Sequence, residues 1–183
     1  MEPSVRLAQP DDAPRIADIY NAGIAERSST FETSPRKSAD VLDWLAAGER
    51  FPVLVAGEGN VIGWARVAAY SERPAYAGVG EVSVFVDPGA RGRGVGTALL
   101  EAVGREAGEL GYWKLTGKLF PENEPSVRLV RRNGWREVGL HLRHGRLEGR
   151  WRDVLVMERL LARDGPHQPQ APAPEGGASS PGA

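Results

Sequence analysis

The segment from Val82 to Leu100, V-S-V-F-V-D-P-G-A-R-G-R-G-V-G-T-A-L-L, constrains the fold more than any other part of the chain. An apolar strand pattern leads into a turn, a glycine-rich loop with two arginines, and then the apolar spacing of an amphipathic helix. Glycines at 92, 94 and 96 allow the backbone to pass close to a bulky group and to turn several N–H groups the same way. The helix that starts there adds the positive end of its dipole. The segment therefore predicts a phosphate or pyrophosphate site.

The rest of the sequence predicts one α/β domain over residues 4–162. The pattern of apolar residues, turns and caps predicts a mixed, largely antiparallel sheet flanked by helices. Strands are expected at 5–7, 52–56, 61–69, 81–86, 113–119, 135–142 and 151–159, and helices after residues 10–12, around 41–45, and at 94–110 and 124–132. Inward positions on the first two helices are expected to be Ile16, Ile19, Tyr20, Ile24, Val41, Leu42 and Leu45. Residues 163–183, rich in Pro, Gly, Ala and Ser, are expected to form a disordered tail.

Composition narrows the class of protein further. The chain has 183 residues and a net charge of −1, so no overall positive field favours nucleic acid. It contains no cysteine, which excludes disulfides, thiolate metal sites and a cysteine nucleophile and fits a reducing compartment. The N-terminus lacks the pattern of a signal peptide, and no apolar run is long enough to cross a bilayer. We therefore expect a cytoplasmic protein with no membrane partner.

Three kinds of glycine-rich loop bind phosphates, and their spacing separates them. A Walker loop needs G-x-x-x-x-G-K-[ST], but no lysine follows the glycines here. A dinucleotide fold needs G-x-G-x-x-G and an acidic residue at the end of the next strand. Here the spacing is G-x-G-x-G, and the next strand ends at Lys118 and Leu119. The third pattern, [QR]-x-x-G-x-[GA], is met by Arg91 to Gly96.

This third pattern resembles motif A of the GCN5-related N-acetyltransferase (GNAT) family, whose loop binds the pyrophosphate of acetyl-CoA. The resemblance covers about Val5 to Leu161 and includes the element order. Four longer stretches are similar to the phosphinothricin and arsinothricin N-acetyltransferase branch of that family. They are N-A-G-I-A-E-R-S-S-T-F-E-T (21–33), F-P-V-L-V-A (51–56), W-K-L-T-G-K-L-F-P-E-N (113–123) and G-R-W-R-D-V (149–154).

The resemblance implies a GNAT fold with a splayed cleft for acetyl-CoA, no metal, and a homodimer. It implies acetyl transfer to the α-amine of a small amino acid of the phosphinothricin, arsinothricin or methionine sulfone/sulfoximine type, with resistance to such compounds. The alternative acceptor is another small amine. The alternative to an enzyme is a non-catalytic acyl-CoA-binding module. The residues implied to bind acetyl-CoA are Val84, Phe85, Val86, Arg91, Gly92, Arg93, Gly94, Val95, Gly96, Thr97, Asn123 and Ser126. Asn123 and Ser126 also suit a helix N-cap.

Glu81, at the start of the strand before the loop, is the candidate catalytic residue. Strand alternation puts its side chain on one face with Ser83 and Phe85. An amine must lose a proton before or during its attack on a thioester, and a nearby carboxylate can accept that proton. In the phosphinothricin branch a Glu stands at this position. The alternative is a strand-end carboxylate held in an ion pair.

The acceptor pocket is less well specified. Related enzymes carry an arginine at the position of Arg73 that can clamp an oxoacid or carboxylate, although Ser71 stands where some have a second one. A solvated loop arginine is the alternative. Phe31, Arg27 and Tyr70 are expected to form walls of the pocket. Many family members use a tyrosine as general acid where this chain has Val130, so the acid is not identified.

Two further features have simple interpretations. His141 and His144 lie three residues apart without nearby acidic or sulfur ligands, so we do not expect a metal site. Arginines cluster in the last third of the chain, at 128, 131, 132, 136, 143, 146, 150 and 152. They favour a solvated face that partly serves the 3′-phosphate of CoA over a nucleic-acid patch, because the overall charge is near zero.

Overall fold

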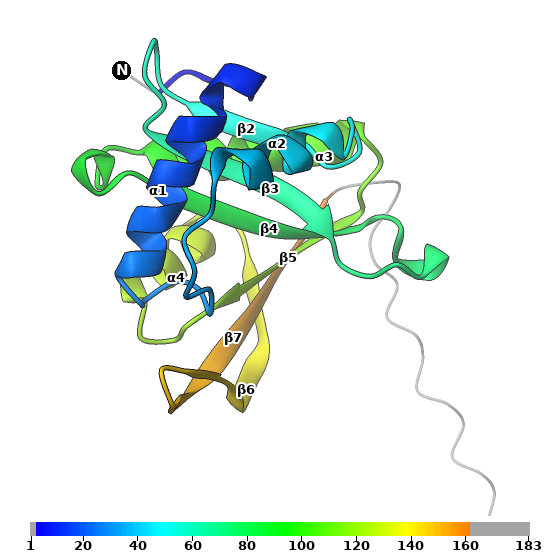
Figure 1. Ribbon diagram of the computed structural model, residues 1–183. Coiled ribbons are helices and arrows are strands. Elements are labelled where there is room, and N and C mark those ends of the chain that lie inside the picture. Colours follow the sequence, from blue (N-terminus) through cyan, green and yellow to red (C-terminus); the bar gives the residue numbers. More distant parts are fainter. Residues whose placement is uncertain (1–2, 162–183) are drawn as a thin grey trace, which may run out of the picture.

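The computed structural model describes residues 3–161, and this part of the chain forms one seven-stranded sheet with helices on both faces (Figure 1). The strands are β1 (Val5–Leu7), β2 (Val53–Ala56), β3 (Gly63–Ala69), β4 (Val79–Val86), β5 (Lys114–Leu119), β6 (Arg136–Leu147) and β7 (Arg150–Leu160). The helices are α1 (Ala13–Ala25), α2 (Ser38–Ala46), α3 (Val95–Glu109) and α4 (Glu124–Arg132), with short 3-10 turns at Pro10–Asp12, Pro74–Tyr76 and Pro88–Ala90. The predicted element order and mixed, mostly antiparallel sheet are confirmed. The predicted tail lies outside the described residues.

The sheet divides in the middle, and this division creates the site. The strand order is β1-β2-β3-β4-β5-β7-β6, and the parallel pair is β4 with β5. That pairing covers three residues on each strand, Val79–Glu81 against Lys114–Thr116. Beyond them β4 continues alongside β3, whereas β5 continues alongside β7, so the two halves of the sheet spread apart (Figure 1).

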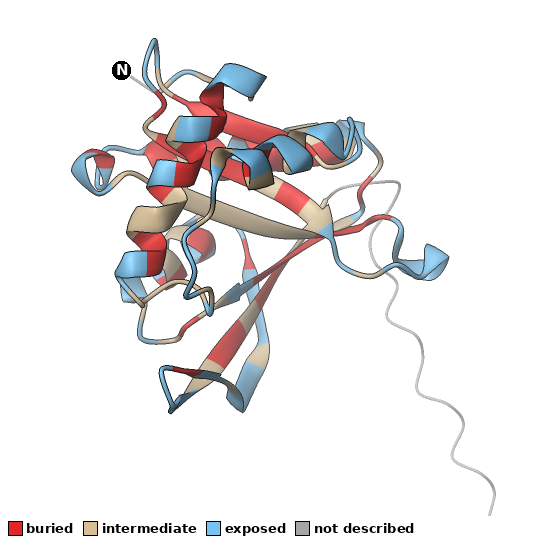
Figure 2. Cartoon of the chain, in the orientation of Figure 1, coloured by how far each residue is buried: buried red, intermediate tan, exposed pale blue. Residues whose placement is uncertain are grey.

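Two apolar clusters hold the helices on opposite faces of the first half of the sheet. On one face, Trp64 of β3 stacks on Phe85 of β4 with ring centroids 5.0 Å apart, and α1 covers them with Ile16 and Tyr20. On the other face, α3 packs through residues that include Leu99. The buried residues follow this two-sided core (Figure 2). Because both faces of β4 are covered, its position is fixed where it borders the gap.

The inward face predicted for α1 is confirmed, but one position on α2 is wrong. Val41 is fully buried, whereas Leu42 leaves 42% of its surface exposed. The short helix turns Val41, Trp44 and Leu45 toward α1 and β3, and Leu42 then falls on the outer side. The expectation failed because three apolar residues within five positions do not define which of two neighbours faces inward.

The N-terminal strand is tied to α1 through a carboxylate. Arg6 donates two hydrogen bonds to Asp12, at 2.7 and 2.9 Å, and the backbone N–H of Gln9 donates a third at 2.7 Å. The hydrogen bonds from Arg6 hold the pKa of Asp12 below its ordinary value. A lowered pKa in the folded state contributes stability above the unfolded pKa, near about pH 4, and that contribution is lost as the pH falls through the folded value.

We therefore expect Asp12→Asn to lower the free energy of unfolding by about 1–2 kcal/mol at pH 7. The difference from wild type should shrink as the pH falls below about 4. Urea denaturation at pH 7 and pH 3 measures both. Asp11→Asn, at an exposed neighbouring position, is the matched control and should match wild type. Equal urea midpoints for Asp12→Asn and wild type at pH 7 would contradict this role.

Candidate active site

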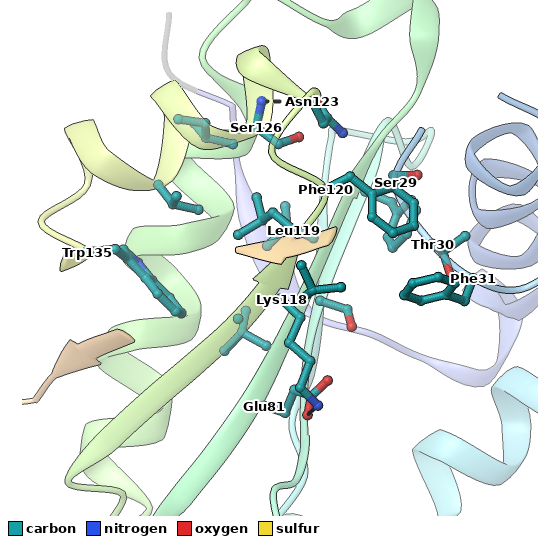
Figure 3. Close-up of a pocket in the computed structure, with 18 of the residues that line it drawn as sticks. Ser29, Thr30, Phe31, Glu81, Lys118, Leu119, Phe120, Asn123, Ser126 and Trp135 are labelled. Carbon is teal, nitrogen blue, oxygen red and sulfur yellow. Dashed lines mark hydrogen bonds and ion pairs between the residues drawn. The ribbon is translucent and has the colours of Figure 1, made fainter. Parts of the chain in front are cut away.

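A cavity of about 600 Å³ fills the gap between the separating strands β4 and β5 (Figure 3). Its walls come from β4, the end of β5, the segments between α1 and α2 and between β5 and α4, and one side of α4. Single residues of α1, α3, β6, β7 and the turn before β6 complete the lining. On this side, residues 82–86 of β4 have no strand partner within residues 3–161, since β5 has already turned away. Their N–H and C=O groups on that edge can therefore pair with an extended ligand.

Glu81 lies at the last paired residue before the strands separate, and it lines the cavity. Its carboxylate Oε2 accepts a hydrogen bond from Nζ of Lys118 on β5 at 2.8 Å, and 32% of its side chain is exposed. Ser83 and Phe85, which share its face by alternation, also line the cavity. The sequence left two interpretations of Glu81, a carboxylate in an ion pair or one that faces the substrate. In the structure Glu81 is in an ion pair and also faces the cavity.

The glycine-rich loop forms a left-handed turn at the start of α3. Gly92 and Gly94 have φ angles of +74° and +80°, a region that favours glycine. Gly94 is the N-cap, so the first backbone N–H groups of α3 have no partner within the helix. Gly96 serves a different purpose, since a Cβ there would lie 2.7 Å from the side chain of Leu129 on α4. The loop therefore presents a helix N-terminus held close to α4.

The side chains around this loop have different surroundings. Arg91 forms an ion pair with Glu26 of the α1 C-cap, with 2.9 Å between the closest atoms. Arg93 and Val95 line a separate hollow beside the β2–β3 turn. The Thr97 hydroxyl accepts a weak 3.5 Å hydrogen bond from Asn133. Of the two loop arginines, Arg91 is therefore engaged in an ion pair, and Arg93 faces a different hollow.

Asn123 joins the two sides of the cavity. Its side-chain oxygen accepts a hydrogen bond from the backbone N–H of Ser126, which caps α4, and its amide donates to the Ser28 carbonyl at 3.1 Å. Both Asn123 and Ser126 line the cavity. Val130, one turn further along α4, lines it with a side chain that carries no proton for a leaving thiolate.

The predicted acceptor residues are only partly brought together at the cavity. Phe31 lines the cavity and meets Phe120 edge-on, with ring centroids 4.9 Å apart. Arg27 does not line it, because its guanidinium is held by Glu148 and the Ile24 carbonyl. Tyr70 and Arg73 also lie outside it, on the exposed loop between β3 and β4. Loop residues far from the strand gap could not be placed by sequence spacing.

The histidine pair lies at the rim. The Nδ1 atoms of His141 and His144 are 3.1 Å apart, and His144 lines the cavity. Among residues 3–161 no cluster of three His, Cys, Asp or Glu side chains could hold a metal ion.

Known proteins share this architecture. A model of the acetyltransferase (GNAT) family matches residues 16–135. The chain belongs to the GNAT family. A solved GNAT superfamily phosphinothricin acetyltransferase from Sinorhizobium meliloti, in complex with acetyl-CoA, aligns with a TM-score of 0.83 and 31% identity over 88% of this chain and 89% of that one. Family membership confirms the predicted fold, the N-acetyltransferase class and acetyl-CoA as co-substrate.

Two curated GNAT relatives match this chain over nearly their full lengths. The phosphinothricin N-acetyltransferase of Streptomyces coelicolor is 32% identical over 166 residues, 87% of this chain and 97% of its own. The L-methionine sulfoximine/L-methionine sulfone acetyltransferase of Pseudomonas paraeruginosa is 31% identical over 165 residues, 88% of this chain and 96% of its own. The resemblance to this branch, first noted from four sequence stretches, is confirmed.

Sequence reasoning missed several residues of the cavity wall, namely Lys118, Phe120 and Trp135. Lys118 lies near the end of β5 and Phe120 directly follows that strand. Alternation along β5 puts Lys118 on one face with Thr116. The sequence did not show at which residue β5 separates from β4. The position of that separation determines that Lys118 contacts Glu81.

Proposed function

We propose that this GNAT enzyme transfers the acetyl group of acetyl-CoA to the α-amine of a small amino acid or analogue, with Glu81 as general base. The observation that carries the proposal is the position of Glu81, at the point where β4 and β5 separate and inside the cavity between them. The open edge of β4 runs from Glu81 toward the N-terminus of α3, which suits the pyrophosphate. A donor laid along this edge would therefore place its thioester near Glu81, and the substrate amine must reach it there.

The donor would be held along β4 and the loop. The open backbone edge at 82–86 pairs with the amides of the pantetheine arm, as an added strand would. The N-terminus of α3 then receives the pyrophosphate on backbone N–H groups of residues 94–97. Arg91 and Arg93 add positive charge, and Asn123 and Ser126 border the arm from α4.

The chemistry needs one base and no covalent enzyme intermediate. Glu81 accepts a proton from the acceptor ammonium, and the neutral amine attacks the thioester carbonyl. Attack gives a tetrahedral intermediate that still carries a second proton on nitrogen. The intermediate collapses with loss of the CoA thiolate, and the second proton passes through water to that thiolate, leaving the N-acetyl product and free CoA thiol. A thiol titrates near about pH 8.5, so its thiolate is a good leaving group and water can protonate it where Val130 cannot.

The acceptor class follows from the named substrates of the relatives. Those names are phosphinothricin, methionine sulfoximine and methionine sulfone, all α-amino acids with a small polar side chain. Acetylation of these toxic analogues would confer resistance to them, and arsinothricin belongs to the same class. Because Arg73 lies outside the cavity, another small amine remains the second candidate acceptor.

The test is release of free thiol from acetyl-CoA with a panel of acceptors. We expect acceptor-dependent release with phosphinothricin, arsinothricin, methionine sulfoximine or methionine sulfone, and little with simple alkyl amines. Faster release with alkyl amines would favour the second candidate. Binding of acetyl-CoA without release for any acceptor would contradict the proposed function.

We also propose that two copies associate through the β6–β7 hairpin. Apolar side chains are exposed along it, with Leu142 72% exposed, and Val138, Leu140 and Trp151 about half exposed. β6 is an edge strand, and an edge with an apolar face can pair with its own copy around a twofold axis. Leu142→Glu is expected to convert a dimer to a monomer in light scattering. A wild-type monomer, or an unchanged dimer in the variant, would contradict this.

Location and other partners are proposed from the donor and from charge. Acetyl-CoA is supplied in the cytoplasm, so we propose that location; within residues 3–161 no helix is long and apolar enough to span a membrane. We propose no nucleic-acid partner, because several clustered arginines are neutralised by ion pairs. These pairs are Arg128–Glu124, Arg131–Glu137, Arg136–Glu158 and Arg152–Glu122.

A further inference from the structure

Lys118 projects into the cavity beside the candidate base, and nothing in the proposed reaction yet uses it. Its Nζ atom lies 2.8 Å from Oε2 of Glu81, and the two side chains meet in the cavity (Figure 3). Lys118 leaves 46% of its side chain exposed, so the ammonium remains accessible to a ligand that enters the cavity.

The charges around the cavity are unevenly distributed. Among the described residues that line it, Lys118 is the one Lys or Arg, whereas Glu32 and Glu81 are both acidic. Glu32 is already paired with Arg36. Arg27 and Arg73, the cations expected from the sequence, lie outside. A carboxylate that enters this cavity therefore finds a full positive charge at Lys118.

An α-amino acid carries an ammonium and a carboxylate on the same carbon, so its opposite charges are as close as those of the Glu81–Lys118 pair. We propose that Lys118 binds the α-carboxylate of the acceptor and so selects α-amino acids over simple amines. On binding, the two ion pairs exchange partners: the acceptor ammonium meets Glu81, and its carboxylate meets Lys118. Each charge therefore keeps a neighbour of opposite sign throughout the exchange.

The exchange also orients the acceptor. Contacts to two charges fix two of the substituents on the α-carbon, the amine and the carboxylate. The amine is then directed to Glu81, and the side chain of the acceptor must extend away from both charges. That direction is bounded by Phe31 and the segment between α1 and α2. An ion pair that served only to hold β4 to β5 would make no distinction between acceptors with and without a carboxylate. The two roles are therefore separable by experiment.

The inference rests on the proposed function, and its test compares two acceptors that differ only in the carboxylate. They are L-methionine sulfone and its decarboxylated counterpart, 3-(methylsulfonyl)propylamine. For Lys118→Met we expect kcat/KM to fall about tenfold for methionine sulfone, mostly through KM, and to change little for the amine. Lys118→Arg should retain most of the preference because it keeps the cation.

A matched control and a binding measurement complete the test. Lys37→Met removes the same charge at an exposed position outside the cavity and should leave both acceptors unaffected. 4-(Methylsulfonyl)butanoate, which has the carboxylate and no amine, should inhibit wild type competitively and Lys118→Met about tenfold more weakly.

The possible failures are distinct. If wild type releases no thiol with any α-amino acid, the proposed function fails, and this inference fails with it. If wild type turns over methionine sulfone but Lys118→Met loses the same factor on both acceptors, or binds the butanoate as tightly as wild type, the inference alone is overturned. Thermal melting of each variant identifies any loss that comes from unfolding.

Discussion

Replacing Glu81 with Gln is expected to lower kcat/KM for acetylation by about 100-fold at pH 7. Gln has the size of Glu, and its side-chain oxygen can still accept the hydrogen bond that Lys118 donates at 2.8 Å. The substitution therefore removes the proton acceptor while keeping the local contacts between β4 and β5. The α-amine of the acceptor holds its proton at neutral pH, so without a base most of the bound amine cannot attack.

The pH dependence provides the sharper measurement. As the pH rises, a growing fraction of the acceptor is neutral before it binds, so the deficit of Glu81→Gln should shrink toward alkaline pH. Rates of thiol release from pH 6 to pH 10, for both proteins, measure this. Glu124→Gln is a suitable control, because Glu124 is an exposed carboxylate whose ion pair lies within α4. Near-wild-type activity of Glu81→Gln at pH 7, or a deficit constant across pH, would exclude Glu81 as base.

Most of the fold could be predicted from local pattern. The loop at 91–96 predicted a strand, a turn and a helix in order, and the helix predicted at 124–132 has the bounds of α4. Leu42 was misassigned because a nine-residue helix presents too few turns to define its inward face. Local rules therefore sufficed where a segment carried its own turn or cap signals.

The site was predictable along β4 and much less so elsewhere. Glu81 could be proposed as the base because alternation and proton chemistry both act within one strand. Arg73 and Tyr70 lie on a loop whose path depends on packing between distant segments, and that path leads away from the cavity. Lys118 could not be singled out because its partner is decided by where β4 and β5 separate. That separation is a property of the sheet as a whole.

Substituting Gly94 by Val is expected to raise KM for acetyl-CoA by roughly 50-fold, with a smaller effect on kcat. Gly94 has a φ angle of +80° and forms the N-cap of α3. A branched side chain is strained in that region, so the backbone should shift and turn the N–H groups of the first turn away from the pyrophosphate. In the protein itself a Cβ at this position meets no atom within 4 Å, so the loss comes from backbone conformation and not from a clash within the fold.

The chain offers a closely matched control for this loop in Gly59, in the turn between β2 and β3. Its φ angle is +74°, and a Cβ there also meets no atom within 4 Å. Gly59→Val should therefore cost a similar amount of unfolding free energy, roughly 1–2 kcal/mol, while leaving KM for acetyl-CoA unchanged. Initial rates at varied acetyl-CoA, together with urea denaturation of both variants, separate strain from lost binding. An equal KM in Gly94→Val and Gly59→Val would show that backbone N–H groups at the start of α3 do not hold the donor.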